Sequence, residues 1–315
     1  MSIRPDLEVP VMAARAIVDG LFVDHTVATV SAIHGGEIAA TYEIAFVEDR
    51  PPAVLKVYPD SVHWKMQKEV AVIALVQDRL TVPAPRILLA DDSKRLLDLN
   101  FVLMSKLPGA TLGLLELALP SDQRASAYRQ IGRLLREFHR IPMDAFGYIG
   151  ARGIPTAHAT NHDYLSWQCD RKLKEFTDRG GAADLARRVA AHFSMRLDLL
   201  RDCAQPVLCH NDLHAGNLLA EITDRGVRLS GVLDFEGALA GDPLMDIAKA
   251  VFYLNTEDRS ALLDGYGDTG RGQWREMLAF YHLYFVLELW CWMAQIGNQE
   301  PLGRLAADLE QCLRV

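Results

Sequence analysis

The sequence has few cysteines and no pattern that would pair them. Its five cysteines are scattered over 315 residues, and none forms a CxxC pair. This absence argues against a disulfide framework and a zinc ribbon, and it favours a reducing compartment. Residues 1–20 also lack a charged start followed by an apolar run, so we expect no signal peptide and a cytoplasmic protein.

The chain also lacks an excess of positive charge. Its formal net charge is −8, from 33 Lys and Arg against 41 Asp and Glu. This balance argues against nucleic acid and anionic membrane as partners and favours a cationic ligand. The longest apolar run, residues 276–297, carries His282 and Glu288 in its middle, which a lipid-facing helix would not tolerate. We therefore interpret this run as a buried core helix.

Internal repeats and low-complexity tracts are absent, so periodicity indicates how the chain is organised. β-branched runs predict strands within residues 26–58, 82–92 and 99–109, and a helical period predicts a helix over 61–80. The rest is mostly helical. A chain of this length favours two lobes. We expect an α+β fold with a β-rich N-terminal lobe (1–104), a hinge (105–112) and a helical C-terminal lobe (113–315).

Polar side chains gather in VLCHNDLHAGNLLAE, residues 207–221, and in GVLDFEG, residues 231–237. A phosphoryl-transfer site needs a carboxylate that orients and deprotonates the acceptor hydroxyl, oxygen ligands for Mg²⁺, and a cation on the donor phosphates. Asp212 can be this carboxylate, and Asn217 and Asp234 can bind the metal. The alternative is a polar corner that only caps turns.

The cation has to come from another part of the chain. Lys56 lies in the apolar strand AVLKVY, where a lone lysine needs a carboxylate, and Glu69 on the next helix can supply it. Two alternatives remain open for this pair. Lys56 could face water from an edge strand, and Glu69 could lie on a solvated helix face beside Lys65 and Lys68.

Two histidines flank Asp212 in the pattern HxDxH. His210 and His214 could ligate a metal ion of borderline softness, but no third or fourth ligand of fitting spacing follows. We favour a hydrogen-bonded core position for His210. The pattern assigns no role to His214.

In order and local spacing, these residues match the protein-kinase signature of strand lysine, helix glutamate, hinge, D-x-x-x-x-N loop and DF metal site. The segments VLKVY, FVLMSKLPG, VLCHNDLHAGNLL and GVLDFEGALAGDPLMDIA resemble the aminoglycoside phosphotransferase family, small-molecule kinases that share the protein-kinase-like fold. Together the matching segments span most of residues 30–255.

The resemblance implies ATP and Mg²⁺ as cofactors and a role for each matching residue. Asp212 would be the catalytic base. Asn217 and Asp234 would bind Mg²⁺. Lys56, positioned by Glu69, would hold the α- and β-phosphates.

The same resemblance places the adenine hinge at Met104 to Leu107. Main-chain groups of Ser105 and Leu107 would face the base, and such contacts leave GTP as an alternative donor. His210 and Asp246 would brace the catalytic loop, although Asp246 could also be an ordinary first-turn helix acid.

The chain departs from the family pattern at several points. Asn211 replaces a glycine, so HGD becomes HND, and DFE stands where kinases have DFG. The segment AIHGGEIAATYEI lacks G-x-G-x-x-G, so only Gly35 and Gly36 are expected to let the backbone approach the phosphates. The stretch between Asp234 and Pro243 is too short for a peptide-docking activation segment. We therefore expect a small-molecule acceptor and no protein substrate.

Carboxylates in the helical part are the candidate ligands for a cationic acceptor: Glu236, Glu288, Asp163 and Asp170. The resemblance favours an aminoglycoside or related antibiotic, with resistance by O-phosphorylation. A small-metabolite kinase for choline, a sugar or an amino acid is the first alternative. A catalytically silent nucleotide-binding protein is the second.

Overall fold

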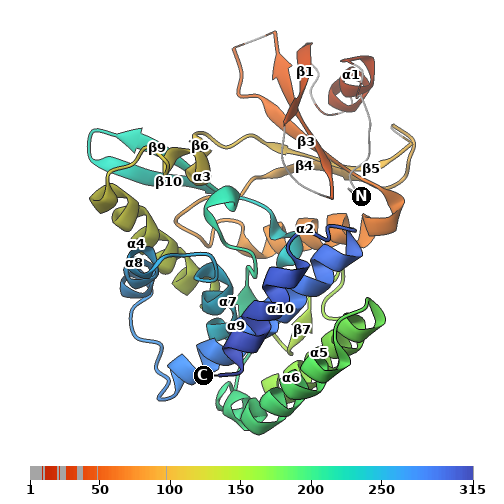
Figure 1. Ribbon diagram of the computed structural model, residues 1–315. Coiled ribbons are helices and arrows are strands. Elements are labelled where there is room, and N and C mark those ends of the chain that lie inside the picture. Colours follow the sequence, from red (N-terminus) through yellow and green to blue (C-terminus); the bar gives the residue numbers. More distant parts are fainter. Residues whose placement is uncertain are drawn as a thin grey trace.

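The computed structural model describes residues 9, 11–19, 21, 26–33, 38–47, 49–96 and 98–314. A β-sheet with one long helix beneath it forms the N-terminal part, and a larger, mostly helical part lies below (Figure 1). The predicted α+β class, with a β-rich N-terminal and a helical C-terminal part, is confirmed. Gly35 and Gly36 lie outside the described residues.

Five antiparallel strands form the N-terminal sheet in the order β1-β2-β3-β5-β4. They are β1 (Val27–Ile33), β2 (Ala40–Phe46), β3 (Ala53–Tyr58), β4 (Ile87–Asp91) and β5 (Asn100–Ser105). Strand β3 is central, and Lys56 lies opposite Thr41 on one neighbour and Val102 on the other. The edge-strand alternative for Lys56 is therefore wrong.

Helix α2 (His63–Val76) follows β3 after the short 3-10 turn η1 (Asp60–Val62), and α1 (Val11–Asp19) packs against β1. Helix α2 contacts β4 and β5 above it and η4 (Phe235–Gly237) below it. Its residues Val72, Ile73 and Val76 belong to the main apolar core of the C-terminal part. Helix α2 therefore joins the sheet to the helices.

The C-terminal part consists of helices around two small sheets. The helices are α3 (Leu112–Leu115), α4 (Ser121–Phe138), α5 (Asn161–Asp178), α6 (Ala183–Arg196), α7 (Pro243–Ala250), α8 (Thr256–Tyr266), α9 (Trp274–Gln295) and α10 (Leu302–Cys312), with 3-10 turns η2 (Leu197–Asp202) and η3 (Ala215–Asn217).

Each of the two small sheets has three strands. The first sheet contains β6 (Ala110–Thr111), β9 (Leu218–Thr223) and β10 (Gly226–Val232), and the second contains β7 (Gly147–Tyr148), β8 (Val207–Cys209) and β11 (Leu239–Gly241). The loop with Asp212 runs from β8 to β9, and the turn with Asp234 runs from β10 to β11. Both polar loops thus connect the two sheets, which brings them together.

Helix α9 is long and apolar enough to cross a membrane by length and composition, with a mean hydropathy of 1.3 over its most apolar window. Core helices pass the same test, and 56% of this window is buried inside the structure. The helix packs against α5, α7 and α10. Its surroundings are those of the core helix predicted from the sequence.

Candidate active site

Lys56 lies at the centre of a cluster of carboxylates. Its ammonium is 3.1 Å from Glu69 Oε2, 3.3 Å from Asp234 Oδ1 and 2.8 Å from Glu236 Oε1. Burial alone would lower the pKa of Lys56, but Asp234, Glu69 and Glu236 outweigh it and raise the pKa well above its ordinary value. Lys56 is therefore a fixed cation in a site that is otherwise acidic.

Glu69 lies on the buried face of α2, with 2% of its surface exposed. It accepts hydrogen bonds from the Lys56 ammonium and from the Tyr58 hydroxyl. Burial raises the pKa of Glu69, and the Lys56 charge opposes this rise. The alternative of a solvated helix face for Glu69 is wrong, and the structure forms the strand-lysine to helix-glutamate pair that the sequence predicted.

Asp212 lies in the loop after β8, and 42% of its side chain is exposed. The Asn217 side-chain amide donates to the Asp212 carbonyl at 2.9 Å and to its Oδ2 at 3.3 Å. The Leu233 amide donates to the Asn217 carbonyl at 2.9 Å, which fixes this loop beside Asp234. Asp212, Asn217 and Asp234 therefore meet at one site, as predicted.

An oxygen-rich donor set suits Mg²⁺. Because the Asn217 amide nitrogen points at Asp212, its side-chain oxygen remains for a metal ion. Burial would raise the pKa of Asp234, but Lys56 and His210 hold it below its ordinary value, so this carboxylate is ionised. The chemistry of Asn217 and Asp234 thus fits the Mg²⁺ that the resemblance implies.

Asp246 and His210 lie under the loop. The Asp246 carboxylate is fully buried and accepts from the His210 amide at 2.8 Å and the Asn211 amide at 2.7 Å. The His210 ring packs against Phe138 and Phe235, and its Nε2 is 3.0 Å from the Leu233 carbonyl. Both residues lie where the predicted bracing role requires them.

Asn211 adopts a left-handed backbone conformation, with φ of 59°. Glycine is favoured at such positions, and asparagine is among the residues that tolerate them best. The Asn211 side chain also donates to the Gly237 carbonyl at 3.2 Å. The HND sequence therefore keeps the loop conformation that a glycine would adopt.

His214 caps the turn η3 and faces the predicted base. Its Nδ1 accepts from the Gly216 amide at 3.0 Å, and its Nε2 lies 3.8 Å from Asp212 Oδ2. His214 therefore lies beside Asp212, and its imidazole does not point to a shared metal site with His210, whose Nε2 is bonded to the Leu233 carbonyl.

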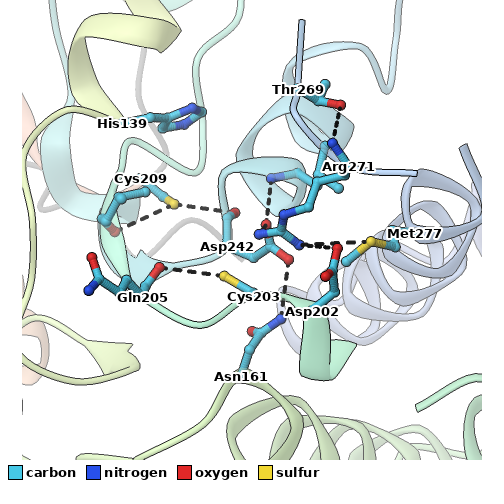
Figure 2. A network of polar contacts seen from close by, with 12 residues as sticks. His139, Asn161, Asp202, Cys203, Gln205, Cys209, Asp242, Thr269, Arg271 and Met277 are labelled. Atoms are coloured by element: carbon cyan, nitrogen blue, oxygen red, sulfur yellow. Dashed lines mark hydrogen bonds and ion pairs between the residues drawn. The ribbon is translucent and has the colours of Figure 1, made fainter. Parts of the chain in front are cut away.

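A second buried network, not predicted from the sequence, supports the start of α7 (Figure 2). Asp242 is fully buried and accepts from the Leu244 amide, the Asn161 side chain and the Tyr281 hydroxyl. Burial raises the pKa of Asp242, and Arg271, 3.5 Å away, opposes the rise. The Asp-Pro pair at the helix start, an N-cap followed by proline at the first position, was the available signal.

The predicted hinge follows β5. The Ser105 amide donates to the Arg86 carbonyl at 2.9 Å, and the Ser105 hydroxyl accepts from the Arg86 amide at 2.9 Å. Both Ser105 groups are therefore bonded to the residue that precedes β4. Among the residues that the structure describes, the Leu107 amide has no acceptor. Met104 is buried at the end of β5. Of these groups, the Leu107 amide is the hydrogen-bond donor that remains available for an adenine base.

Asp212 and Glu236 open onto a pocket of about 650 Å³ between the two parts of the chain. Helices α2, α5, α7 and α9 contribute its walls. Of the four predicted substrate carboxylates, Glu236 and Glu288 line this pocket, whereas Asp163 and Asp170 are exposed on α5 and do not. The structure therefore does not gather the four carboxylates at one place.

The two carboxylates in the pocket are already paired. Glu236 bonds to Lys56 and lies 3.7 Å from Lys65, and Glu288 lies 3.3 Å from Lys249. Lys65 and Lys249 were not predicted as pocket residues. They lie on the separate helices α2 and α7, and their spacing in the sequence gave no signal that they would meet.

The chain matches the model of the phosphotransferase enzyme family over residues 29–280. No curated protein matches it. A solved structure of a thermostable mutant of aminoglycoside phosphotransferase APH(4)-Ia is similar at 18% identity, with a TM-score of 0.74, over 95% of this chain and 98% of that one.

The GDP and kanamycin complex of APH(2")-IIIa is similar at 16% identity, with a TM-score of 0.70, over 96% of this chain and 98% of that one. At these identities the likeness shows the fold, which is the protein-kinase-like fold of aminoglycoside phosphotransferases. The match to the family model covers most of the sequence. The chain therefore belongs to the phosphotransferase enzyme family.

Proposed function

We propose that this protein is an ATP- and Mg²⁺-dependent phosphotransferase that acts on a hydroxyl group of a small molecule in the cytoplasm. The observation that carries the proposal is the meeting of Lys56, Asp212 and Asp234, which come from three distant segments. Solved complexes of similar proteins contain ADP, AMP-PNP or GDP, which supports a nucleotide donor and leaves GTP as an alternative.

Each group has a defined chemical task. The Asp212 carboxylate, partly exposed and held by Asn217, can orient the acceptor hydroxyl and take its proton as the phosphoryl group moves. Lys56, kept protonated by its carboxylate partners, can bind the donor phosphates. Mg²⁺, held by Asn217 and Asp234, would neutralise phosphate charge. Positioning of the two reactants supplies much of the rate.

The route from Asp234 to α7 favours a small acceptor. Only η4 and the short strand β11 separate Asp234 from the start of α7 at Pro243, which leaves no segment on which a peptide could dock. The solved complexes with hygromycin B and kanamycin make an aminoglycoside one acceptor to test, with resistance as the consequence. The pairing of Glu236 and Glu288 with lysines does not favour a polycation.

The decisive variant is Asp212→Asn, which keeps the shape of the side chain and removes the base. ATP consumption is measured with Mg²⁺ and a panel of aminoglycosides, sugars, amino acids, hydroxy acids and sugar phosphates, and products are weighed by mass spectrometry. We expect turnover of the accepted compound to fall by at least about 100-fold in the variant. AMP-PNP binding should stay close to that of the wild type.

Asp163→Asn is the matched control, because Asp163 is an exposed aspartate outside the pocket. Its turnover should equal that of the wild type. Normal turnover in Asp212→Asn would contradict the assigned base. Tight Mg·ATP binding with no transfer to any compound would instead favour the catalytically silent alternative.

A further inference from the structure

The pocket beside Asp212 carries more positive than negative side chains, although the whole chain has a net charge of −8. Its cations are Lys65, Lys68, Arg171, Lys172 and Lys249, and its carboxylates are Asp212, Glu236 and Glu288. Within this set, Lys65 faces Glu236, Lys249 faces Glu288, and Lys172 bonds to Glu175 just outside the pocket at 2.9 Å. Lys68 and Arg171 remain without a carboxylate partner among the described residues.

Lys68 is the more unusual of the two. Only 1% of its surface is exposed, and its ammonium has neither a hydrogen-bond acceptor nor a carboxylate within ion-pair distance among the described residues. Its Nζ lies 5.1 Å from the centre of the Tyr148 ring, which also lines the pocket. An ammonium buried without an acceptor is costly, and such a group is normally paired. Lys68 therefore presents to the pocket a charge that no described side chain pairs.

Arg171 is fixed on the opposite wall. Its guanidinium bonds twice to the side-chain oxygen of Gln168, at 3.1 Å and 2.6 Å, and Gln168 is fully buried. The guanidinium also stacks on Trp167, with its central carbon 5.4 Å from the ring centre. All of these partners are neutral, so the positive charge of Arg171 is oriented but not compensated. Arrangements of this kind are suited to carboxylates and phosphates.

Both cations act on the same aromatic side chain. Lys68 faces the ring of Tyr148, and Arg171 lies close enough to its hydroxyl to oppose the rise that burial causes in the pKa of Tyr148. Asp212 borders the same pocket, and the volume of about 650 Å³ is within the usual range for small-molecule sites. One small molecule could therefore place a hydroxyl at Asp212 and an anionic group between Lys68 and Arg171.

We propose that the acceptor of this phosphotransferase carries an anionic group, a carboxylate or a phosphate, and that Lys68 and Arg171 bind it. The proposal rests on the function proposed above, since that function places the hydroxyl at Asp212. The same two charges repel a polycation. They select the acceptor and take no part in the transfer itself.

The competing assignment is that Lys68 binds the phosphates of the nucleotide. The test therefore uses the full chain saturated with Mg·AMP-PNP, so that the nucleotide site is filled. Inorganic phosphate and tartrate are then titrated calorimetrically as the two anionic probes, and kanamycin is titrated as the cationic one. We expect at least one of the anions to bind and kanamycin not to bind. The anion that binds identifies which of the two chemical classes the pocket prefers.

Three variants locate the binding. Lys68→Met and Arg171→Gln should each weaken anion binding by about tenfold or more, since each removes a charged hydrogen-bond donor. Lys172→Gln is the matched control, because it removes one charge from the same pocket but that charge is already compensated by Glu175. Its affinity for the anion should remain near that of the wild type.

Several results would overturn the proposal. The first is that neither anion binds at concentrations up to tens of millimolar, and the second is that kanamycin binds instead. The third is that Lys68→Met and Arg171→Gln bind the anion as tightly as the wild type does. The fourth is that Lys172→Gln loses as much anion affinity as these two variants. A loss of AMP-PNP affinity in Lys68→Met with unchanged anion affinity would assign Lys68 to the nucleotide. The anion titration can also be run without nucleotide, so failure to bind AMP-PNP or to transfer phosphate would contradict only the proposed function.

Discussion

Replacement of Lys68 by methionine should stabilise the folded protein. The side chain is buried on α2 and its ammonium has no acceptor among the described residues. Lys65 repels the charge, and Glu236 offsets that repulsion only in part. Methionine is of similar length and has no charge, so it removes the desolvation cost and keeps most of the packing.

The magnitude follows from the titration of the lysine. Burial lowers the pKa of Lys68 from 10.5 to about 7. Between these two pH values the unfolded chain binds more protons than the folded one, so stability rises with pH across this window. The loss of stability that the buried Lys68 causes is complete below pH 7, and it is absent above the pKa of this lysine in the unfolded chain. Because one unit of pKa difference is worth about 1.4 kcal/mol, Lys68→Met should gain about 5 kcal/mol below pH 7.

Urea unfolding of wild type and variant from about pH 6 to about pH 10 measures this gain. Lys174→Met is the control, because Lys174 lies on the neighbouring α5 with 75% of its side chain exposed, and its replacement should change stability by less than about 0.5 kcal/mol. The gain from Lys68→Met should be constant below about pH 7 and should shrink steadily as the pH rises from there. A variant that is no more stable than wild type near pH 7, or a gain that does not vary with pH, would refute the reasoning.

Substitutions at three further positions test the loop and the lysine pair. Asn211→Ala should lose about 1 kcal/mol of stability in thermal unfolding because of its positive φ, whereas Asn211→Gly should lose less; equal losses would contradict this. Asp246→Asn removes the charged acceptor of two loop amides and should lose about 2 kcal/mol in urea unfolding together with turnover; wild-type stability would exclude the bracing role. Glu69→Gln should lower kcat/KM for ATP by about tenfold in steady-state assays, since Lys56 loses its buried partner; an unchanged value would argue against the pair.

The strands and helices were largely predictable because their side-chain periods differ. The runs within 26–58 became β1, β2 and β3, and the segment 61–80 became α2, although its first residues form the turn η1. The order β1-β2-β3-β5-β4 was not available from the pattern. Apolar neighbours of Lys56 fit a central strand and a half-buried edge strand alike, so only the pairing with both β2 and β5 decided its position.

The direction in which each residue projects from α2 and α5 explains why the sequence did not predict the cations of the pocket. On α2, Lys65, Lys68 and Glu69 are close in sequence, and the pattern gave no reason to bury Lys68. On α5, Asp170 points to solvent whereas its neighbour Arg171 lines the pocket. The spacing of apolar residues in a short helix does not show whether the neighbouring helix face packs on the core or lines a polar pocket.

The sequence by itself predicted the residues that we propose for the transfer, because Asp212, Asn217 and Asp234 lie in two short segments whose local spacing is fixed by the turns between neighbouring strands. It also predicted a small acceptor, through the short connection between Asp234 and Pro243. The charge of the pocket beside Asp212 was decided only by the tertiary structure. Its side chains come from four helices, and electrostatic compensation depends on distances in space that no local pattern records.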